Sequence, residues 1–107
     1  MSVPDRTDAI RQMLAKTPDD VFLHYSLAME LLSAGACDNA ADEFRRCITL
    51  DAGYLAAHVE LGKTLRMAGR LDEARAAFDR ALQLAQTQGQ NHTQDYIRQQ
   101  LEGLPRS

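Results

Sequence analysis

The chain contains a gapless internal repeat, and this feature constrains its fold more than any other. When residues 21–54 are aligned against residues 55–88, ten positions carry the same residue. The identical pairs are His24/His58, Leu27/Leu61, Leu31/Leu65, Ala34/Ala68, Gly35/Gly69, Asp38/Asp72, Ala40/Ala74, Phe44/Phe78, Arg46/Arg80 and Leu50/Leu84. A fixed period of this length is typical of a stacked array, in which each structural unit packs against its neighbours.

Each unit has the hydrophobic pattern of two helices joined by a short turn. Leu23, Leu27 and Leu31 recur at every fourth position in the first unit, which is the spacing of one helix face. Gly35 and Gly69 follow the first helix of each unit and predict its end, because glycine readily adopts the positive φ of a helix C-terminus. Two helices joined by a short turn pack antiparallel, so the sequence predicts an all-α stack of helical hairpins.

The acidic residues are expected to cap helices or to be solvated on helix surfaces, rather than to take part in a reaction. One group stands where helices are expected to begin, and its carboxylates can accept hydrogen bonds from free N–H groups: Asp19, Asp20, Asp38 and Asp72. A second group is expected to be solvated on exposed helix faces: Glu43, Glu73 and Asp79. The acidic residues therefore predict no catalytic pair.

Small residues predict a close contact between the helices of each hairpin. Gly62 lies inside a predicted helix, where it costs about 1 kcal/mol relative to alanine. A tight contact with the second helix offsets this cost. We therefore expect Gly62 to face Ala74, with Phe78 filling the space further along the helix.

These residues resemble the tetratricopeptide repeat (TPR), a 34-residue helical hairpin with the pattern W-x2-L-G-x2-Y, then A-x3-F, then A and P. The matching residues are Leu27, Ala28, Ala40 and Phe44 in the first unit, and Leu61, Gly62, Ala74 and Phe78 in the second. The chain departs from the pattern with His in place of Trp, Leu in place of Tyr, and no Pro at the end of either unit. The resemblance implies a right-handed superhelical stack, a TPR-like α-solenoid.

The flanking segments extend the stack to about six helices in a single domain. Residues 5–17 are expected to form the second helix of an incomplete preceding repeat, residues 21–54 and 55–88 two full repeats, and residues 92–104 a C-terminal capping helix. Terminal units of such stacks are atypical because they must cover an open end. The stripe expected to cover it is Tyr96, Ile97, Leu101 and Leu104.

Composition and charge exclude several classes of function. With 45% hydrophobic and 25% charged residues, the chain has an ordinary globular composition. Its net charge of −3 argues against nucleic-acid binding, which requires a basic surface. No apolar run approaches the roughly 18 residues of a membrane span, and the start of the chain shows no apolar signal segment. We therefore expect a cytoplasmic protein without membrane insertion.

The sequence shows no pattern typical of an enzyme, a cofactor site or a metal site. It lacks a glycine-rich phosphate loop, H-E-x-x-H and G-x-S-x-G, so we expect neither catalysis nor a cofactor. His24, His58 and His92 are each separated by one repeat period, but equivalent positions in a stack do not converge on one metal ion. We expect His24 and His58 to pack between repeats, and Cys37 and Cys47 to be unreactive thiols.

The resemblance implies that the first helix of each hairpin lines a concave groove where partner segments bind. By the family's register the groove residues are Phe22, Tyr25, Met29, Val59, Glu60, Lys63, Arg66 and Met67. Tyr and Met suit a contact surface, because one combines an apolar body with a polar tip and the other adapts its shape. Coverage of Phe22, Tyr25 and Met29 by a terminal helix of the same chain is the alternative. The Lys/Asn clamp of the subclass that binds acidic chaperone tails is absent.

The sequence thus favours a protein–protein interaction module or adaptor that binds a peptide segment or helix of a partner in its concave groove. The alternative is a structural, self-associating subunit of a larger assembly, because an exposed apolar end of a repeat stack can pack against its copy in a homodimer.

Overall fold

The computed structural model describes residues 6–105, and this part of the chain forms six helices and no strand. The helices are α1 (Arg6–Lys16), α2 (Val21–Ser33), α3 (Cys37–Leu50), α4 (Leu55–Met67), α5 (Leu71–Thr87) and α6 (Asn91–Gly103). The expected all-α helical repeat is therefore confirmed. The first residue of the N-terminal helix as predicted, Asp5, lies outside the described residues.

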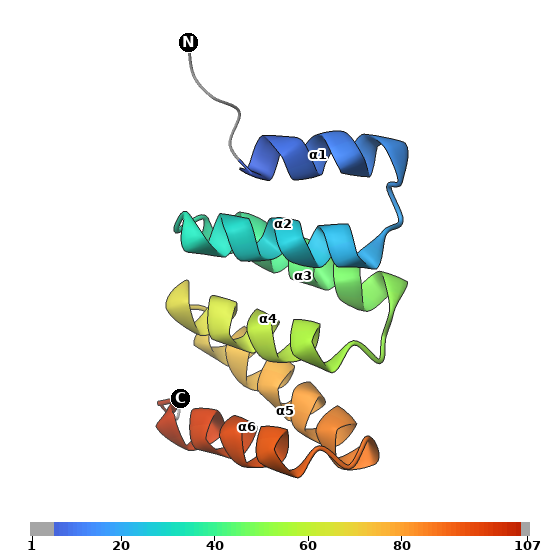
Figure 1. The fold of residues 1–107 in the computed structure, drawn as a ribbon. Helices are drawn as coiled ribbons and strands as arrows, with labels where there is room; N and C mark the ends of the chain where they lie inside the picture. Colours follow the sequence, from blue (N-terminus) through green and yellow to red (C-terminus); the bar gives the residue numbers. More distant parts are fainter. Residues whose placement is uncertain (1–5, 106–107) are drawn as a thin grey trace.

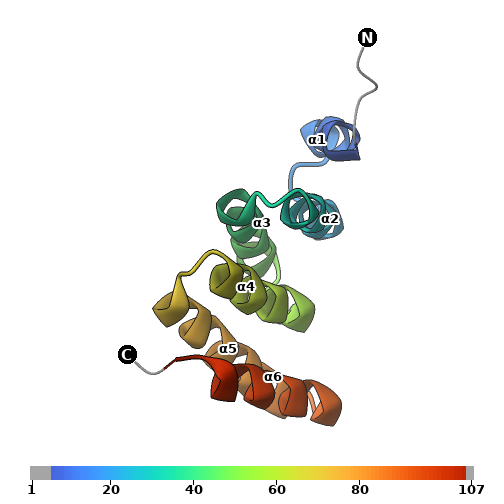
Figure 2. The same cartoon turned by 90° about the vertical axis from the view of Figure 1, so that its left-hand side faces the viewer.

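The helices form an elongated stack in which each one packs against its neighbours in sequence (Figure 1). Helices α2 and α4 lie on one side and helices α3 and α5 on the other, and α1 stands at the N-terminal end (Figures 1 and 2). We call the first side, which α6 continues, the α2/α4/α6 face, and the second side the α3/α5 face. The principal dimensions are 47 × 27 × 20 Å.

Glycines end the first helix of each hairpin as predicted. Gly35 and Gly69 have φ values of +80° and +77°, and Gly89 repeats this geometry between α5 and α6 with φ +69°. The N–H group that follows each glycine donates to a carbonyl in the last turn of the preceding helix, at 2.9 Å in each case: Ala36 to Leu31, Arg70 to Leu65, and Gln90 to Ala85. The three turns are thus the same structure repeated along the chain.

The predicted helix caps are only partly correct. Asp20 caps α2, since its Oδ1 accepts hydrogen bonds from the N–H groups of Phe22 and Leu23 at 3.0 and 3.2 Å. The expectation for Asp38 and Asp72 was wrong, because α3 and α5 begin at the residue before each of them. These carboxylates lie inside the first helical turn, where they interact favourably with the helix dipole but cap no N–H group.

The hairpin contact around Gly62 is as close as its glycine suggests. A Cβ atom at Gly62 would lie 2.7 Å from two ring atoms of Phe78, which is fully buried. The nearest neighbour is therefore the aromatic ring of Phe78 rather than Ala74. The ring lies directly against the α4 backbone and leaves no room for a side chain there.

The C-terminal helix covers the end of the stack with part of its expected stripe. Ile97 and Leu104 are buried against Phe78, Ala81 and Ala85, and Leu101 is partly buried beside them. Tyr96 was expected in this stripe, but its side chain lies outside the cluster and is 37% exposed. Its neighbour Ile97 takes the buried position of that helical turn.

We predict that Gly62→Ala destabilises the fold even though alanine is the better helix former. The higher helix propensity of alanine should raise the free energy of unfolding by about 1 kcal/mol. The added methyl group also forces the Phe78 ring out of its site, and this overpacking should lower the free energy of unfolding by about 1–3 kcal/mol, which outweighs the gain. Urea unfolding followed by circular dichroism measures the difference. Gly103→Ala is the matched control, since nothing lies within 4 Å of its added methyl group. Equal stability changes in the two variants would contradict the packing.

The caps make a second prediction. Asp20→Ala removes two hydrogen bonds to free N–H groups and should lower the free energy of unfolding by about 1 kcal/mol. Asp72→Ala removes only a dipole interaction on an exposed turn and should cost less than about 0.5 kcal/mol. The same urea titration compares both variants, and a larger loss for Asp72→Ala would show that the assignment of caps is wrong.

Candidate functional site

Two aromatic rings pack against Tyr25 of α2. Tyr25 stacks on Tyr54 at a centroid distance of 5.2 Å and meets the edge of Phe44 at 5.7 Å. Burial raises the pKa of both tyrosine hydroxyls, and the negative charge of Glu60 raises the pKa of Tyr25 further. Tyr54 was not among the expected site residues, because it stands in the loop before α4 and outside the helical pattern. Tyr25 therefore packs against the chain's own side chains.

Phe22, Tyr25 and Met29, three of the expected groove residues, do not form one exposed surface. Phe22 is 69% exposed, whereas Tyr25 and Met29 are partly buried against the hydrophobic core. The two rings that contact Tyr25 come from α3 and from the α3–α4 loop. Met67, near the other end of the face, is 60% exposed.

The next interface, between α4 and α6, is open. Its cavity of about 380 Å³ is lined by Leu55, Ala56, Val59 and Glu60 from α4 and by His92, Thr93 and Tyr96 from α6. The register of the repeat explains the opening. Val59 stands at the position of Tyr25, so a smaller side chain occupies the place of a ring that packs against two others in the first repeat.

The position equivalent to Tyr54 also carries no ring that could fill this cavity. Gln88 takes that position, and its side-chain amide donates to the Gly53 carbonyl at 2.9 Å. The α6 residues of the cavity were missed by sequence reasoning, which treated that helix only as a cap. Extending the register one repeat further, from His58 to His92, was the signal that could have found them.

The charged residues expected in the groove already have partners within the chain. Lys63 Nζ lies 3.2 Å from Glu60 Oε1, and Arg66 donates to the side-chain oxygen of Gln100. Glu60 is 16% exposed, and its second oxygen, Oε2, is buried without a hydrogen-bond partner. The cavity thus combines apolar walls with one half-satisfied carboxylate, an arrangement that can hold an aliphatic side chain beside a hydrogen-bond donor.

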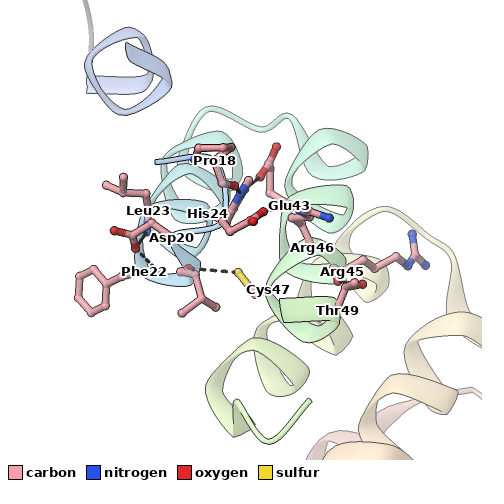
Figure 3. Close-up of polar contacts among 12 residues, drawn as sticks. Pro18, Asp20, Phe22, Leu23, His24, Glu43, Arg45, Arg46, Cys47 and Thr49 are labelled. Atoms are coloured by element: carbon pink, nitrogen blue, oxygen red, sulfur yellow. Dashed lines mark hydrogen bonds and ion pairs between the residues drawn. The ribbon is translucent and has the colours of Figure 1, made fainter. Parts of the chain in front are cut away.

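His24 and His58, which were expected to pack between repeats, each bond to a carbonyl that precedes their own repeat, and His24 also pairs with a carboxylate inside its own repeat. His24 Nδ1 lies 2.7 Å from Glu43 Oε2, and its Nε2 lies 2.7 Å from the Pro18 carbonyl oxygen (Figure 3). Glu43 was expected to be solvated, which was wrong, because it turns inward to pair with this ring. His58 Nε2 makes the equivalent bond to the Ala52 carbonyl at 2.9 Å. Among residues 6–105, no group of three or more His, Cys, Asp or Glu side chains is arranged to hold a metal ion.

The buried cysteine has the environment of an unreactive thiol. Burial raises the pKa of Cys47 to about 11, so the group is a thiol rather than a nucleophilic thiolate at neutral pH. Its Sγ lies 3.7 Å from the Val21 carbonyl oxygen (Figure 3). Cys37 is partly buried at the start of α3.

Comparison with known proteins agrees with this architecture. The family model of the tetratricopeptide repeat matches residues 31–92. The TPR repeat-containing protein PA0015 of Pseudomonas aeruginosa is 33% identical over 100 residues, which cover 94% of this chain and 95% of that protein.

Solved structures show the same fold. The solution structure of protein BPP2914 from Bordetella parapertussis has a TM-score of 0.82 at 27% identity, covering 94% of this chain and 87% of that one. A tetratricopeptide repeat domain protein from Salinibacter ruber has a TM-score of 0.74 at 25% identity, covering 84% and 94%. The chain therefore belongs to the tetratricopeptide repeat family.

Proposed function

We propose that this chain is a cytoplasmic adaptor that binds a peptide segment or helix of a partner protein on its α2/α4/α6 face and catalyses no reaction. The observation that carries the proposal is the open cavity between α4 and α6. TPR domains in general mediate protein–protein interactions and are non-catalytic scaffolds. None of the helices among the described residues has the length and apolar character to cross a membrane.

The surroundings of the cavity support this assignment. Leu55, Val59 and Tyr96 provide apolar and aromatic contact area, which dominates binding at protein interfaces. Phe22 and Met67 lie on the helices of the same face with most of their side chains exposed. A partner segment that crosses these helices would bury them as well. The contact area is small, so we expect modest affinity.

We predict that Ala56→Arg abolishes partner binding without unfolding the chain. Ala56 is exposed at the mouth of the cavity, so a long side chain there blocks entry while remaining compatible with a helix. The wild type and the variant are immobilised, a cell lysate is passed over both, and retained proteins are identified by mass spectrometry.

Ala15→Arg on α1 is the matched control, because it adds the same side chain at an exposed helical position away from the cavity. Circular dichroism confirms that all three proteins are folded. A protein retained by the wild type and by Ala15→Arg, but lost on Ala56→Arg, places the site at the cavity. Equal retention on Ala56→Arg removes the cavity from the proposal.

Self-association is the second candidate, and the N-terminal end of the stack favours it. No residue of α1 is buried, and Met13 is 54% exposed beside the partly buried Ile10 and Leu14. A homodimer formed through this end would cover these side chains. We predict that Met13→Lys shifts a concentration-dependent dimer to monomer in sedimentation velocity. A wild type that stays monomeric across a wide concentration range removes this candidate.

A further inference from the structure

A second open region lies between α3 and α5. Its larger cavity, of about 470 Å³, has apolar walls that include Ile48, Leu61 and Ala77. It adjoins a smaller cavity of about 300 Å³, and both are lined by Ile48, His58 and Arg80. The region belongs to the α3/α5 face, and neither cavity shares a residue with the one between α4 and α6.

In the first repeat, the residues equivalent to His58 and Arg80 are each paired with a carboxylate. The equivalents of His58 and Arg80 are His24 and Arg46, and each has a carboxylate partner. His24 Nδ1 lies 2.7 Å from Glu43 Oε2, and Arg46 donates to Asp19 Oδ1 at 2.9 Å. At these positions the chain itself therefore supplies two anions, Glu43 from α3 and Asp19 from the loop before α2.

The second repeat keeps the histidine and the arginine and lacks both carboxylates. In the register of the repeat, Ala77 is the equivalent of Glu43, and Gly53 is the equivalent of Asp19. Among the described residues, no hydrogen bond or ion pair joins Arg80 to another side chain, and the only hydrogen bond of the His58 ring is the one from Nε2 to the Ala52 carbonyl.

The orientation of the His58 ring follows from that bond. Ala52 is the equivalent of Pro18, so both rings are held by the same carbonyl position through Nε2. The Nδ1 atom of His58 is consequently directed as in His24, toward the position that Ala77 leaves unfilled. Ala77 itself lines the larger cavity.

The other charges at this cavity are paired. Arg45 donates to Glu73 at 3.3 Å and lies 3.8 Å from Asp42. Glu73 is held by hydrogen bonds from Arg70, which lower the pKa of its carboxyl group, so it remains ionised and paired. His58 and Arg80 are therefore the basic side chains at the cavity that have no acidic partner. Together they favour the binding of an anion.

We propose that the α3–α5 cavity binds a glutamate or aspartate side chain from an acidic segment of a partner protein, with its carboxylate in the place that Glu43 occupies in the first repeat. Because Nε2–H of His58 already donates to a carbonyl, Nδ1 must donate to the carboxylate, and the bound ring carries both protons. Arg80 supplies further charge-assisted donors. Ile48, Leu61 and Leu65 contact the aliphatic part of the segment.

The test uses two capped peptides, one with two glutamates flanked by leucines and one with glutamines in their place. Each is titrated into the isotope-labelled full chain, and NMR follows the backbone amides and histidine rings. We expect the glutamate peptide to shift the signals of His58, Ala77 and Arg80 and to bind at least about fivefold more tightly than the glutamine peptide. Equal affinities, or shifts confined to α4 and α6, would overturn the proposal.

Variants locate the carboxylate. Arg80→Gln should weaken the glutamate peptide by at least about threefold, whereas Arg46→Gln, the same change where Asp19 is already the partner, should leave its affinity unchanged. Ala77→Glu should abolish binding, because the chain then fills the cavity as the first repeat does. Ala77→Glu should also bring the His58 ring signals close to those of His24, and unchanged ring signals would contradict the orientation inferred for His58.

Two further controls distinguish this site from the α4–α6 groove and from self-association. Ala56→Arg should leave the glutamate peptide bound, so failure of the α4–α6 groove and failure of this site are distinguishable. Signals at the α3–α5 cavity that shift with protein concentration alone would show that a second copy of the chain occupies it, which overturns the assignment to a partner segment.

Discussion

The close packing of Phe78 on the bare backbone of Gly62 is the contact on which the second hairpin depends. The ring is fully buried and approaches α4 so closely that a single methyl group would collide with it. This contact holds α4 and α5 together as one unit, as the equally buried Phe44 does within the first hairpin. Because each hairpin is packed internally in this way, its outer side chains are free to differ from repeat to repeat. Those differences decide which interfaces between hairpins are closed and which are open.

The two repeats share a backbone and differ in how their interfaces are filled. On the α2/α4/α6 face, the rings of Tyr25 and Tyr54 stack on each other, whereas Val59 and Gln88 stand at the equivalent positions in the second repeat, where a cavity opens between α4 and α6. On the α3/α5 face, Glu43 pairs with His24 in the first repeat, whereas Ala77 leaves the equivalent ring of His58 beside a cavity. The two cavities therefore lie on opposite faces of the segment from α3 to α6. In the functions proposed above, this segment carries the binding sites.

Much of the fold could be predicted from the sequence, because the repeat period and the glycines at 35 and 69 depend on local geometry. The caps of α3 and α5 were misplaced because a shift of a single position separates a cap from a first-turn carboxylate, and hydrophobic spacing does not resolve it. The cavities could not be predicted from identities between repeats. They arise where the repeats differ, as at Glu43 and Ala77, and where a loop residue such as Tyr54 packs across an interface. A position-by-position comparison of where the two repeats differ would have indicated these cavities. The identities between the repeats did not.

The most direct test of where a partner binds is hydrogen–deuterium exchange of the full chain, alone and in complex with a protein that the immobilised wild type retained from the lysate. The amides of α4, α5 and α6 that face the cavities should exchange more slowly in the complex, while those of α1 should be unchanged. Slower exchange confined to α1 and α2 would contradict the account, because it would place the partner away from both cavities.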